Sequence, residues 1–202
     1  MSRQSWISTL ALIILPACLG TGALCAQQSG PPSVAHRRSD VELVDQHGRK
    51  VMFYSGLLKG RVVAINTIFT TCTTVCPIMG VRFAQLSRLL DSEDAGGVML
   101  VSISTDPLVD TPQRLDAWSR QFIPTASNWE LLTGRKDEVD TLLKELGLFA
   151  ADKSEHPSVV LVGDSGTNNW TFVPSTLSPA KLAQMLKARK IAEAVPSDRS
   201  RR

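Results

Sequence analysis

The chain has 202 residues, of which 43% are hydrophobic and 20% charged, and its formal net charge is +3. This length suits a single domain, and the apolar content is enough for a sizeable core, which excludes a chain that is disordered throughout. The small charge excludes a general nucleic-acid binder, so we expect no nucleic-acid partner. Much of the positive charge lies in residues 195–202, which we predict to be a disordered basic tail.

The N-terminus has the pattern of an export signal. Arg3 precedes an uncharged apolar stretch, which small residues and then a polar segment follow. We therefore predict that residues 1–26 are a cleaved signal peptide or a membrane anchor, and LPAC around Cys18 also resembles a lipoprotein box. Each alternative exports the folded part, either into the periplasm or held at the inner membrane facing it. Contact with the membrane is then made only through this segment, and residues 27–40 form a flexible tether.

Export changes the meaning of the four cysteines. Cys18 and Cys25 belong to the targeting segment, so the folded domain holds only Cys72 and Cys76. One pair is not the dense disulfide framework of a small secreted protein. In an oxidising compartment such a pair is oxidised, kept reduced by a dedicated partner, or occupied by a metal.

Residues 41–194 have the strand and helix patterns of one α/β domain. A near-continuous β-branched run over 61–69 indicates a buried strand of parallel type. Thr111 and Pro112 have the residue types that begin a helix, and Gly147 stands where another helix ends. The predicted elements, in chain order, are a hairpin over 40–60, a strand over 61–69, a helix over 77–94, a strand over 97–104, helices over 111–122 and 137–149, a hairpin over 158–174 and a helix over 178–195.

A parallel core followed by an antiparallel hairpin and a final helix is the plan of the thioredoxin fold. We therefore predict an α/β, thioredoxin-like fold with an N-terminal β-hairpin extension. In that plan the reactive cysteines lie where the first core strand meets its helix, which is here the junction from Thr70 to Pro77.

Cys72 and Cys76 stand four positions apart at this junction, in NTIFTTCTTVCPIMG. A helix N-terminus favours the thiolate, which is both a nucleophile and a metal ligand. Residues four apart in a helical turn have Cβ atoms about 5–6 Å apart, whereas a disulfide needs about 3.8 Å. A bridge requires that Cys72 lie in the loop and swing inward, whereas one metal ion fits between the two sulfurs with little adjustment. Two thiolates alone suit a soft monovalent ion, and a borderline cation needs a nitrogen as well.

The chain has three histidines that could supply this nitrogen. His36 lies in the tether and His47 at a polar turn, and both are expected to be solvated. His156 directly precedes the strand that starts the final hairpin, and in a thioredoxin fold this loop faces the cysteines, usually through a cis-proline, which Pro157 would be. Cys72, Cys76 and His156 would then form a three-ligand site for Cu(I) and Cu(II), whereas zinc would require a fourth ligand.

The segment STDPLVDTP, residues 104–112, follows the second core strand at the same edge as the cysteines. Two interpretations of its acidic residues remain open. Asp106 and Asp110 either orient the loops of the site, or Asp110 and Thr111 simply begin the next helix.

FTTCTTVCPIM, STDPLVDTP and His156 together resemble the Sco/SenC family, which comprises exported thioredoxin-fold proteins that bind copper. The similarity runs from about Asp45 to Lys190. It implies that Cys72, Cys76 and His156 bind copper, and that the chain assists assembly of the binuclear copper centre of cytochrome c oxidase. The implied partners are the copper-bearing subunit of that oxidase, or another cysteine-bearing copper acceptor, and a thioredoxin-like reductant. The sequence departs from the family at Thr73, where many members have proline, and at Pro157, where a small polar residue is usual.

A chaperone of this kind is not an enzyme, but the same residues admit other functions. A periplasmic thiol–disulfide oxidoreductase would use Cys72 and Cys76 as a redox-active disulfide without an obligatory metal. TTVCP matches the nucleophile motif of a peroxidase, which needs an arginine on the cysteine face, and no arginine lies between Arg135 and Arg189. A copper-dependent redox sensor is a third alternative.

Overall fold

The computed structural model describes residues 40–91, 97–122, 128–167 and 169–194. The predicted signal or anchor over 1–26, the tether up to residue 39 and the basic tail over 195–202 lie outside the described residues. Among the helices within the described ranges, none is both long and apolar enough to cross a membrane.

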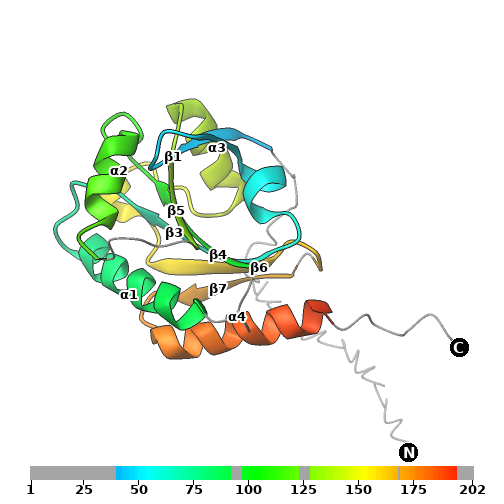
Figure 1. The fold of residues 1–202 in the computed structure, drawn as a ribbon. Coiled ribbons are helices and arrows are strands. Elements are labelled where there is room, and N and C mark those ends of the chain that lie inside the picture. The colour runs from blue at the N-terminus through cyan, green and yellow to red at the C-terminus, as the bar shows by residue number, and fades with distance from the viewer. Residues whose placement is uncertain (1–39, 92–96, 123–127, 168, 195–202) are drawn as a thin grey trace, which may run out of the picture. The chain divides into compact units, whose positions relative to one another are not determined.

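The domain is built on a seven-stranded sheet with the strand order β2-β1-β5-β4-β3-β6-β7 (Figure 1). The three central strands β5, β4 and β3 are parallel, and antiparallel strands flank them on both sides. The strands are β1 (Glu42–Asp45), β2 (Lys50–Met52), β3 (Val62–Ile68), β4 (Val98–Ser104), β5 (Trp129–Thr133), β6 (Val159–Asp164) and β7 (Asn169–Pro174). This architecture confirms the thioredoxin-like fold with an N-terminal hairpin.

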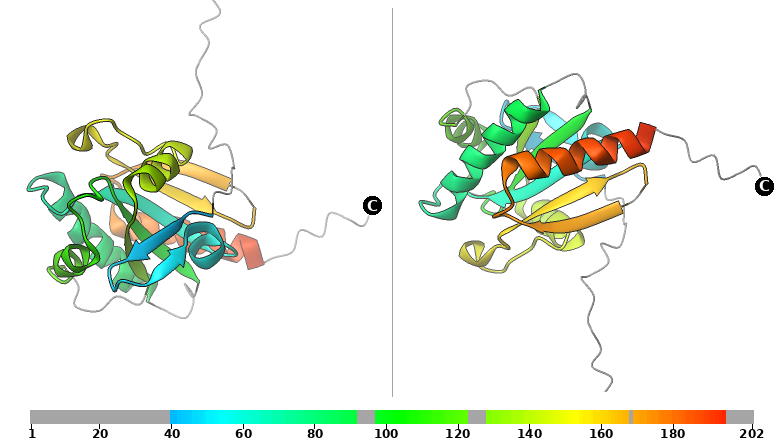
Figure 2. Two further views of the ribbon diagram at one scale, coloured as in Figure 1. Left: turned by 90° about the horizontal axis from the view of Figure 1, so that it is seen from above. Right: turned by 90° about the horizontal axis from the view of Figure 1, so that it is seen from below.

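Helices cover both faces of the sheet (Figure 2). Helices α1 and α4 lie side by side on one face, and α3 lies on the other (Figures 1 and 2). The helices are α1 (Val75–Leu90), α2 (Pro112–Ser119), α3 (Lys136–Glu145) and α4 (Pro179–Ala194), with a π-helical segment at Phe53–Leu58 and a 3₁₀ turn at Lys153–Glu155.

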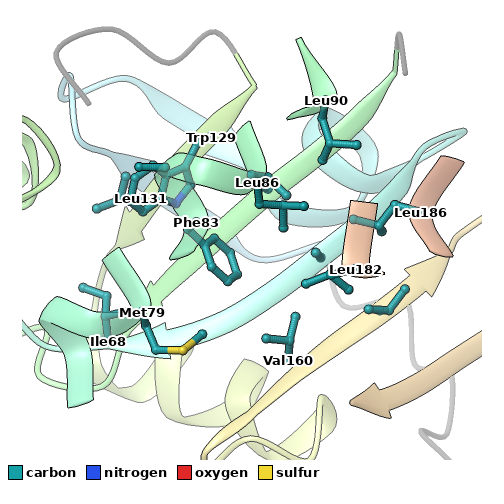
Figure 3. Packing of buried hydrophobic residues seen from close by; sticks show 14 of the residues in the cluster. Ile68, Met79, Phe83, Leu86, Leu90, Trp129, Leu131, Val160, Leu182 and Leu186 are labelled. Carbon is teal, nitrogen blue, oxygen red and sulfur yellow. The ribbon is translucent and has the colours of Figure 1, made fainter. Parts of the chain in front are cut away.

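Each face of the sheet has its own hydrophobic core, because side chains alternate along a strand. In β3, Val62, Ala64 and Ile68 join the core beneath α1 and α4, whereas Val63 and Ile65 join the core on the side of α3. Figure 3 shows the first core, in which side chains of α1 and α4 meet on the sheet. With both faces covered, β3 is buried at every position, which accounts for its largely apolar sequence, in which only Asn66 and Thr67 are polar.

The structure differs from the sequence-based prediction in several elements, among them α3, which ends at Glu145 rather than at residue 149. β5 was not predicted, because its five residues WELLT are too few to show a clear strand pattern between two helical ones. The N-terminal hairpin ends at Met52 and continues as the π-helical segment, so the prediction of strand up to residue 60 was wrong. Helix α1 begins at Val75, two residues earlier than predicted, which places Cys76 inside its first turn.

Candidate metal centre

The cysteines lie at the carboxyl edge of the parallel strands, where the chain passes from β3 into α1. Cys72 lies in the loop, is 8% exposed, and faces the first turn of the helix, whereas Cys76 in that turn is fully buried. The N-cap residue Thr74 makes no side-chain capping bond. Instead the amide N–H of Cys76 donates to the Sγ atom of Cys72 across 3.4 Å. The sulfur of Cys72 therefore accepts from an amide that the helix itself leaves without a partner.

The two thiols have opposite pKa shifts. Burial alone would raise the pKa of Cys72, but hydrogen bonds from Cys76 and Thr74 outweigh it and lower the pKa to about 7. Burial raises the pKa of Cys76 to about 12, and the neighbouring Cys72 and the negative charge of Asp110 act in the same direction. Near neutral pH Cys72 is therefore about half ionised, whereas Cys76 remains a protonated thiol.

His156 reaches this edge because β6 runs antiparallel to β3, so the start of β6 lies beside the carboxyl end of β3. The Nε2 atom of His156 lies 3.8 Å from the Sγ atom of Cys76, although the two residues are 80 positions apart in sequence. The Nδ1 atom lies 3.1 Å from the Oγ1 atom of Thr67. In the tautomer in which Nδ1–H donates to Thr67, Nε2 offers its lone pair to the site. Burial lowers the pKa of His156, which favours the neutral, metal-binding imidazole.

The loop that carries His156 differs from the prediction at Pro157. All peptide bonds within the described part of the chain are trans, so the expectation of a cis-proline after His156 was wrong. His156 is oriented instead by Thr67 and by the ring of Phe69, which it meets edge-to-face at 5.9 Å between centroids. Both partners lie in the quoted stretch NTIFTTCTTVCPIMG, but sequence reasoning gave neither of them a role, because their contact with His156 depends on how β6 pairs with β3.

The other histidines take no part in this arrangement. His47 is exposed at the turn between β1 and β2, where its ring contacts the side chain of Gln46. Strands β5 and β4 separate β1 from β3, so His47 is remote from the cysteines. His36 lies outside the described residues.

The three predicted ligands gather at one edge without forming a closed site. Both cysteines are free thiols. In the ranges that the structure describes, no three His, Cys, Asp or Glu side chains are close enough together to hold a metal ion as they stand. Cys76 and His156 already touch, so the Cys72 loop is the part that has to close to complete a three-ligand site.

The loop between β4 and α2 supports the cysteine loop, which decides between the two interpretations of its acidic residues. The carboxylate of Asp110 is fully buried and accepts from the amide and hydroxyl of Thr70 and from the hydroxyl of Ser104. The cap of α2 is the Thr111 hydroxyl, which accepts from the Arg114 amide at 3.3 Å. Asp110 therefore orients the cysteine loop, and Thr111 begins the helix.

Sequence reasoning also missed Arg114, whose Nε atom donates to the hydroxyl of Thr70 at 3.4 Å. The absence of an arginine between Arg135 and Arg189 is therefore no argument against a peroxidase, because Arg114 lies before that segment. The argument against a peroxidase now rests on Cys76, the cysteine of the TTVCP motif. Full burial and a pKa of about 12 leave almost none of it as the thiolate that would attack a peroxide.

These features define a thioredoxin-like protein with two thiols and an imidazole at the carboxyl edge of its parallel strands. Residues 30–190 match the SCO1/SenC family, and the chain belongs to that family.

Individual relatives agree with this placement. The chain is 31% identical over 126 residues to a SCO1 protein homolog of Bacillus subtilis, covering 62% of this chain and 61% of that protein. Copper-bound yeast Sco1 has the same fold, with a TM-score of 0.64 and 20% identity over 84% of this chain and 99% of that one. BsSco, described as a Sco-family cytochrome c oxidase assembly protein with a disulfide switch, has a TM-score of 0.63 and 24% identity, covering 74% and 91%. The chain spans about three fifths of the length of the first curated relatives it matches.

Proposed function

We propose that the chain is an exported copper-binding assembly factor that serves the copper centre of cytochrome c oxidase. The observation that carries this proposal is the 3.8 Å approach of the Cys76 sulfur to His156 Nε2, with the Cys72 sulfur at the same helix N-terminus. In a member of the SCO1/SenC family, this approach supports a copper site made of the three residues that the family resemblance assigns to copper.

The donor set fits copper as a cargo ion. Thiolate sulfurs are soft ligands that select Cu(I), and the imidazole adds the nitrogen that Cu(II) prefers. A structural zinc site needs four protein ligands, and the described residues bring no fourth donor to these three. The site lies at a loop edge, which suits an ion that is to be passed on.

The pKa difference gives the two thiols different roles. Cys72 is about half ionised at pH 7, far more than Cys76, and sits in the loop, so it makes the first bond to an incoming ion. Cys76 loses its proton as the ion binds, because a coordinating thiol must be deprotonated. Release proceeds by exchange of Cys72 and Cys76 for thiolates of the acceptor docked at this edge. The acceptor is the copper-bearing subunit of the oxidase or another cysteine-bearing copper protein.

The same asymmetry supports a second function, reduction of the acceptor's cysteines. The Cys72 thiolate attacks one sulfur of the acceptor disulfide, forming a mixed disulfide and releasing one acceptor thiolate. Cys76 then loses its proton and attacks Cys72, which forms the Cys72–Cys76 disulfide and leaves the acceptor as a dithiol. The two electrons come from this chain, and a thioredoxin-like reductant restores its thiols. Without copper in the cycle, this is the oxidoreductase alternative.

Anaerobic titration of the reduced chain with Cu(I) and Cu(II) tests the proposal. We expect one tightly bound copper per chain, and a sulfur-to-Cu(II) charge-transfer band. Cys72→Ser or Cys76→Ser should abolish tight binding of both ions. His156→Ala should weaken Cu(II) by at least about tenfold and Cu(I) much less, since two thiolates still suit the monovalent ion.

His47→Ala is the matched control, because it removes an exposed imidazole outside the site and should leave both affinities unchanged. An absence of tight copper binding, together with a readily reversible Cys72–Cys76 disulfide, would reject the copper proposal in favour of the oxidoreductase.

A further inference from the structure

The segment that carries His156 has little packing support on one side. It passes through the exposed 3₁₀ turn Lys153–Glu155, none of whose residues is buried. The preceding residues Ala150 and Asp152 line a hollow of about 360 Å³. A segment that borders open space on one side is held by few apolar contacts, so individual polar contacts carry more of its positioning.

One ion pair ties this turn to the rest of the site. The ammonium of Lys153 pairs with the carboxylate of Asp106 in the loop after β4, and it also lies 5.3 Å from the centre of the Phe69 ring. The same ring meets His156 edge-to-face. Lys153 therefore holds the turn against the ring that orients the imidazole.

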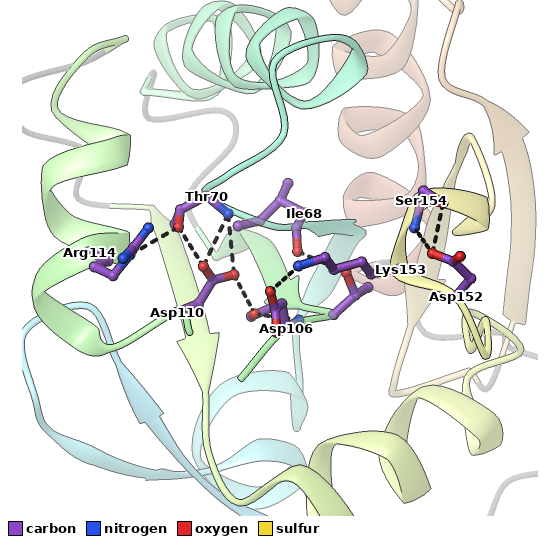
Figure 4. A network of polar contacts seen from close by, with 10 residues as sticks. Ile68, Thr70, Asp106, Asp110, Arg114, Asp152, Lys153 and Ser154 are labelled. Atoms are coloured by element: carbon purple, nitrogen blue, oxygen red, sulfur yellow. Dashed lines mark hydrogen bonds and ion pairs between the residues drawn. The ribbon is translucent and has the colours of Figure 1, made fainter. Parts of the chain in front are cut away.

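Polar contacts extend from this ion pair to the cysteine loop, as Figure 4 shows. The amide of Asp106 donates to the hydroxyl oxygen of Ser104 at 3.0 Å, and that hydroxyl donates to Asp110 at 2.6 Å. Asp110 in turn accepts from Thr70 at the base of the cysteine loop. One continuous polar network thus links the His156 segment to the Cys72 loop through the loop between β4 and α2.

We propose that Lys153 and Asp106 are positioning residues for His156, and that their ion pair sets how tightly the site holds Cu(II) relative to Cu(I). This inference rests on the proposed copper function. The ion pair lies at the His156 end of this network, and Asp110 keeps its own contacts with Thr70 and Ser104 at the other end. Loss of the pair therefore loosens the imidazole while both thiols stay in place. Cu(II), which depends on the nitrogen, is weakened, and Cu(I), which two thiolates can hold, is not.

The exposure of the pair gives the proposal a second signature. The side chain of Lys153 is 41% exposed and that of Asp106 is 14% exposed, so salt screens their attraction. Raising the ionic strength should therefore weaken Cu(II) binding by the wild-type chain and have little effect on Lys153→Met, which lacks the positive charge.

The test compares Lys153→Met and Asp106→Asn with a control pair that borders the same hollow. Lys136 and Asp140 also line the hollow and pair with each other at 2.6 Å, but both belong to α3 rather than to the His156 segment. Lys136→Met therefore removes an ion pair beside the hollow without loosening the imidazole. Lys153→Arg keeps the charge and serves as the conservative rescue.

We expect Lys153→Met and Asp106→Asn each to lower Cu(II) affinity about tenfold and Cu(I) affinity by less than about twofold, as for other partners that support a metal ligand. Lys153→Arg and Lys136→Met should behave as the wild type. Equal losses for both oxidation states, or the same loss in Lys136→Met, would overturn the proposal.

A measurement without copper separates this proposal from the proposed function. The ring-proton chemical shifts of His156 in the reduced chain report its place against Phe69, and they should change in Lys153→Met but not in Lys136→Met. Unchanged shifts in Lys153→Met would overturn the positioning role. A wild-type chain that binds no copper would instead overturn the proposed function, and with it the effect of the ion pair on Cu(II).

Discussion

The amide of Cys76 donates to the sulfur of Cys72 across 3.4 Å, and this hydrogen bond lowers the pKa of Cys72 but not that of Cys76. The amide at the helix N-terminus stabilises the thiolate of Cys72, whereas at Cys76 burial outweighs the backbone hydrogen bond with Phe69 and keeps the thiol protonated. The site therefore separates an ionised thiol near the surface from a protonated thiol in the core. A pair with equal pKa values would lack this division of roles.

Selective alkylation of the reduced chain should reveal this difference. We expect iodoacetamide to modify Cys72 at least about 100-fold faster than Cys76 at pH 7, because the thiolate is the nucleophile and Cys76 is both protonated and buried. The rate at Cys72 should rise with pH and level off above a midpoint near 7. Peptide mapping of the alkylated chain gives both rates, and comparable rates at the two cysteines would contradict the assigned pKa order.

Copper affinity should depend on pH with two different slopes. A bound ion displaces the proton of Cys76 at every pH below about 12, and it displaces a proton from Cys72 only below about 7. Apparent Cu(I) affinity should therefore fall about 100-fold for each pH unit below about 7, and about tenfold for each unit between about 7 and 9. Burial lowers the pKa of His156 and favours its neutral form, so protons compete little with copper for the imidazole in this pH range.

Chelator competition for Cu(I) at a series of pH values measures these slopes. Cys72→Ser cannot serve as the control, because it removes a ligand. The independent check is the number of protons released when Cu(I) is added at pH 9 and at pH 6. Release of about one proton at pH 9 and of about two at pH 6 is expected. A single slope across the whole range would mean that the two thiols titrate together.

Much of the fold follows from sequence periodicity, and the exceptions have physical causes. The buried run of β3 and the capped start of α2 carry strong local signals, and both elements form where they were predicted. β5 carries no such signal, because its identity as a strand depends on pairing with β4 and β1. The trans peptide before Pro157 likewise depends on how the whole loop packs.

The site was predictable to the extent that its residues belong to motifs. We predicted from the cysteine spacing, and from the position of His156 before β6, that the three residues lie at the carboxyl edge of the parallel strands. The structure places Cys72, Cys76 and His156 at that edge. Their division into an ionised and a protonated thiol depends on one hydrogen bond and on burial, which the sequence does not display. Lys153 lies close to Asp106 only because two loops far apart in sequence meet.

Gly80, one turn beyond Cys76, makes room for the aromatic ring that closes over α1. A Cβ atom there would lie 2.4 Å from the Cε2 atom of Phe122. Gly80→Ala should therefore lower the free energy of unfolding by about 1–3 kcal/mol, because the ring has to move out of a packed position. Gly56→Ala is the matched control, since its Cβ would meet nothing closer than Met52 at 3.8 Å. Denaturant unfolding of both variants measures this difference. Equal free energies of unfolding would show that the Phe122 ring can move aside without a cost in stability.

Asp110 should combine a structural effect with an effect on copper, because its carboxylate is fully buried and accepts from both Thr70 and Ser104. Asp110→Ala should lower the free energy of unfolding by about 2–4 kcal/mol, since it leaves buried donors without acceptors. It should also weaken Cu(I) and Cu(II) to a similar extent, because the loop that it releases carries Cys72 rather than His156. Ser104→Ala removes only one of these donors and should have a smaller effect on stability.

Unfolding curves and parallel titrations with both ions separate the two acidic residues of this loop. If Asp110→Ala lowered the affinity for Cu(II) alone, Asp110 would act through the segment that carries His156, contrary to its contacts. We expect Asp110→Ala to lower the affinity for both ions and Asp106→Asn to lower the affinity for Cu(II) alone. This result would show that the loop between β4 and α2 supports the thiols through Asp110 and the imidazole through Asp106.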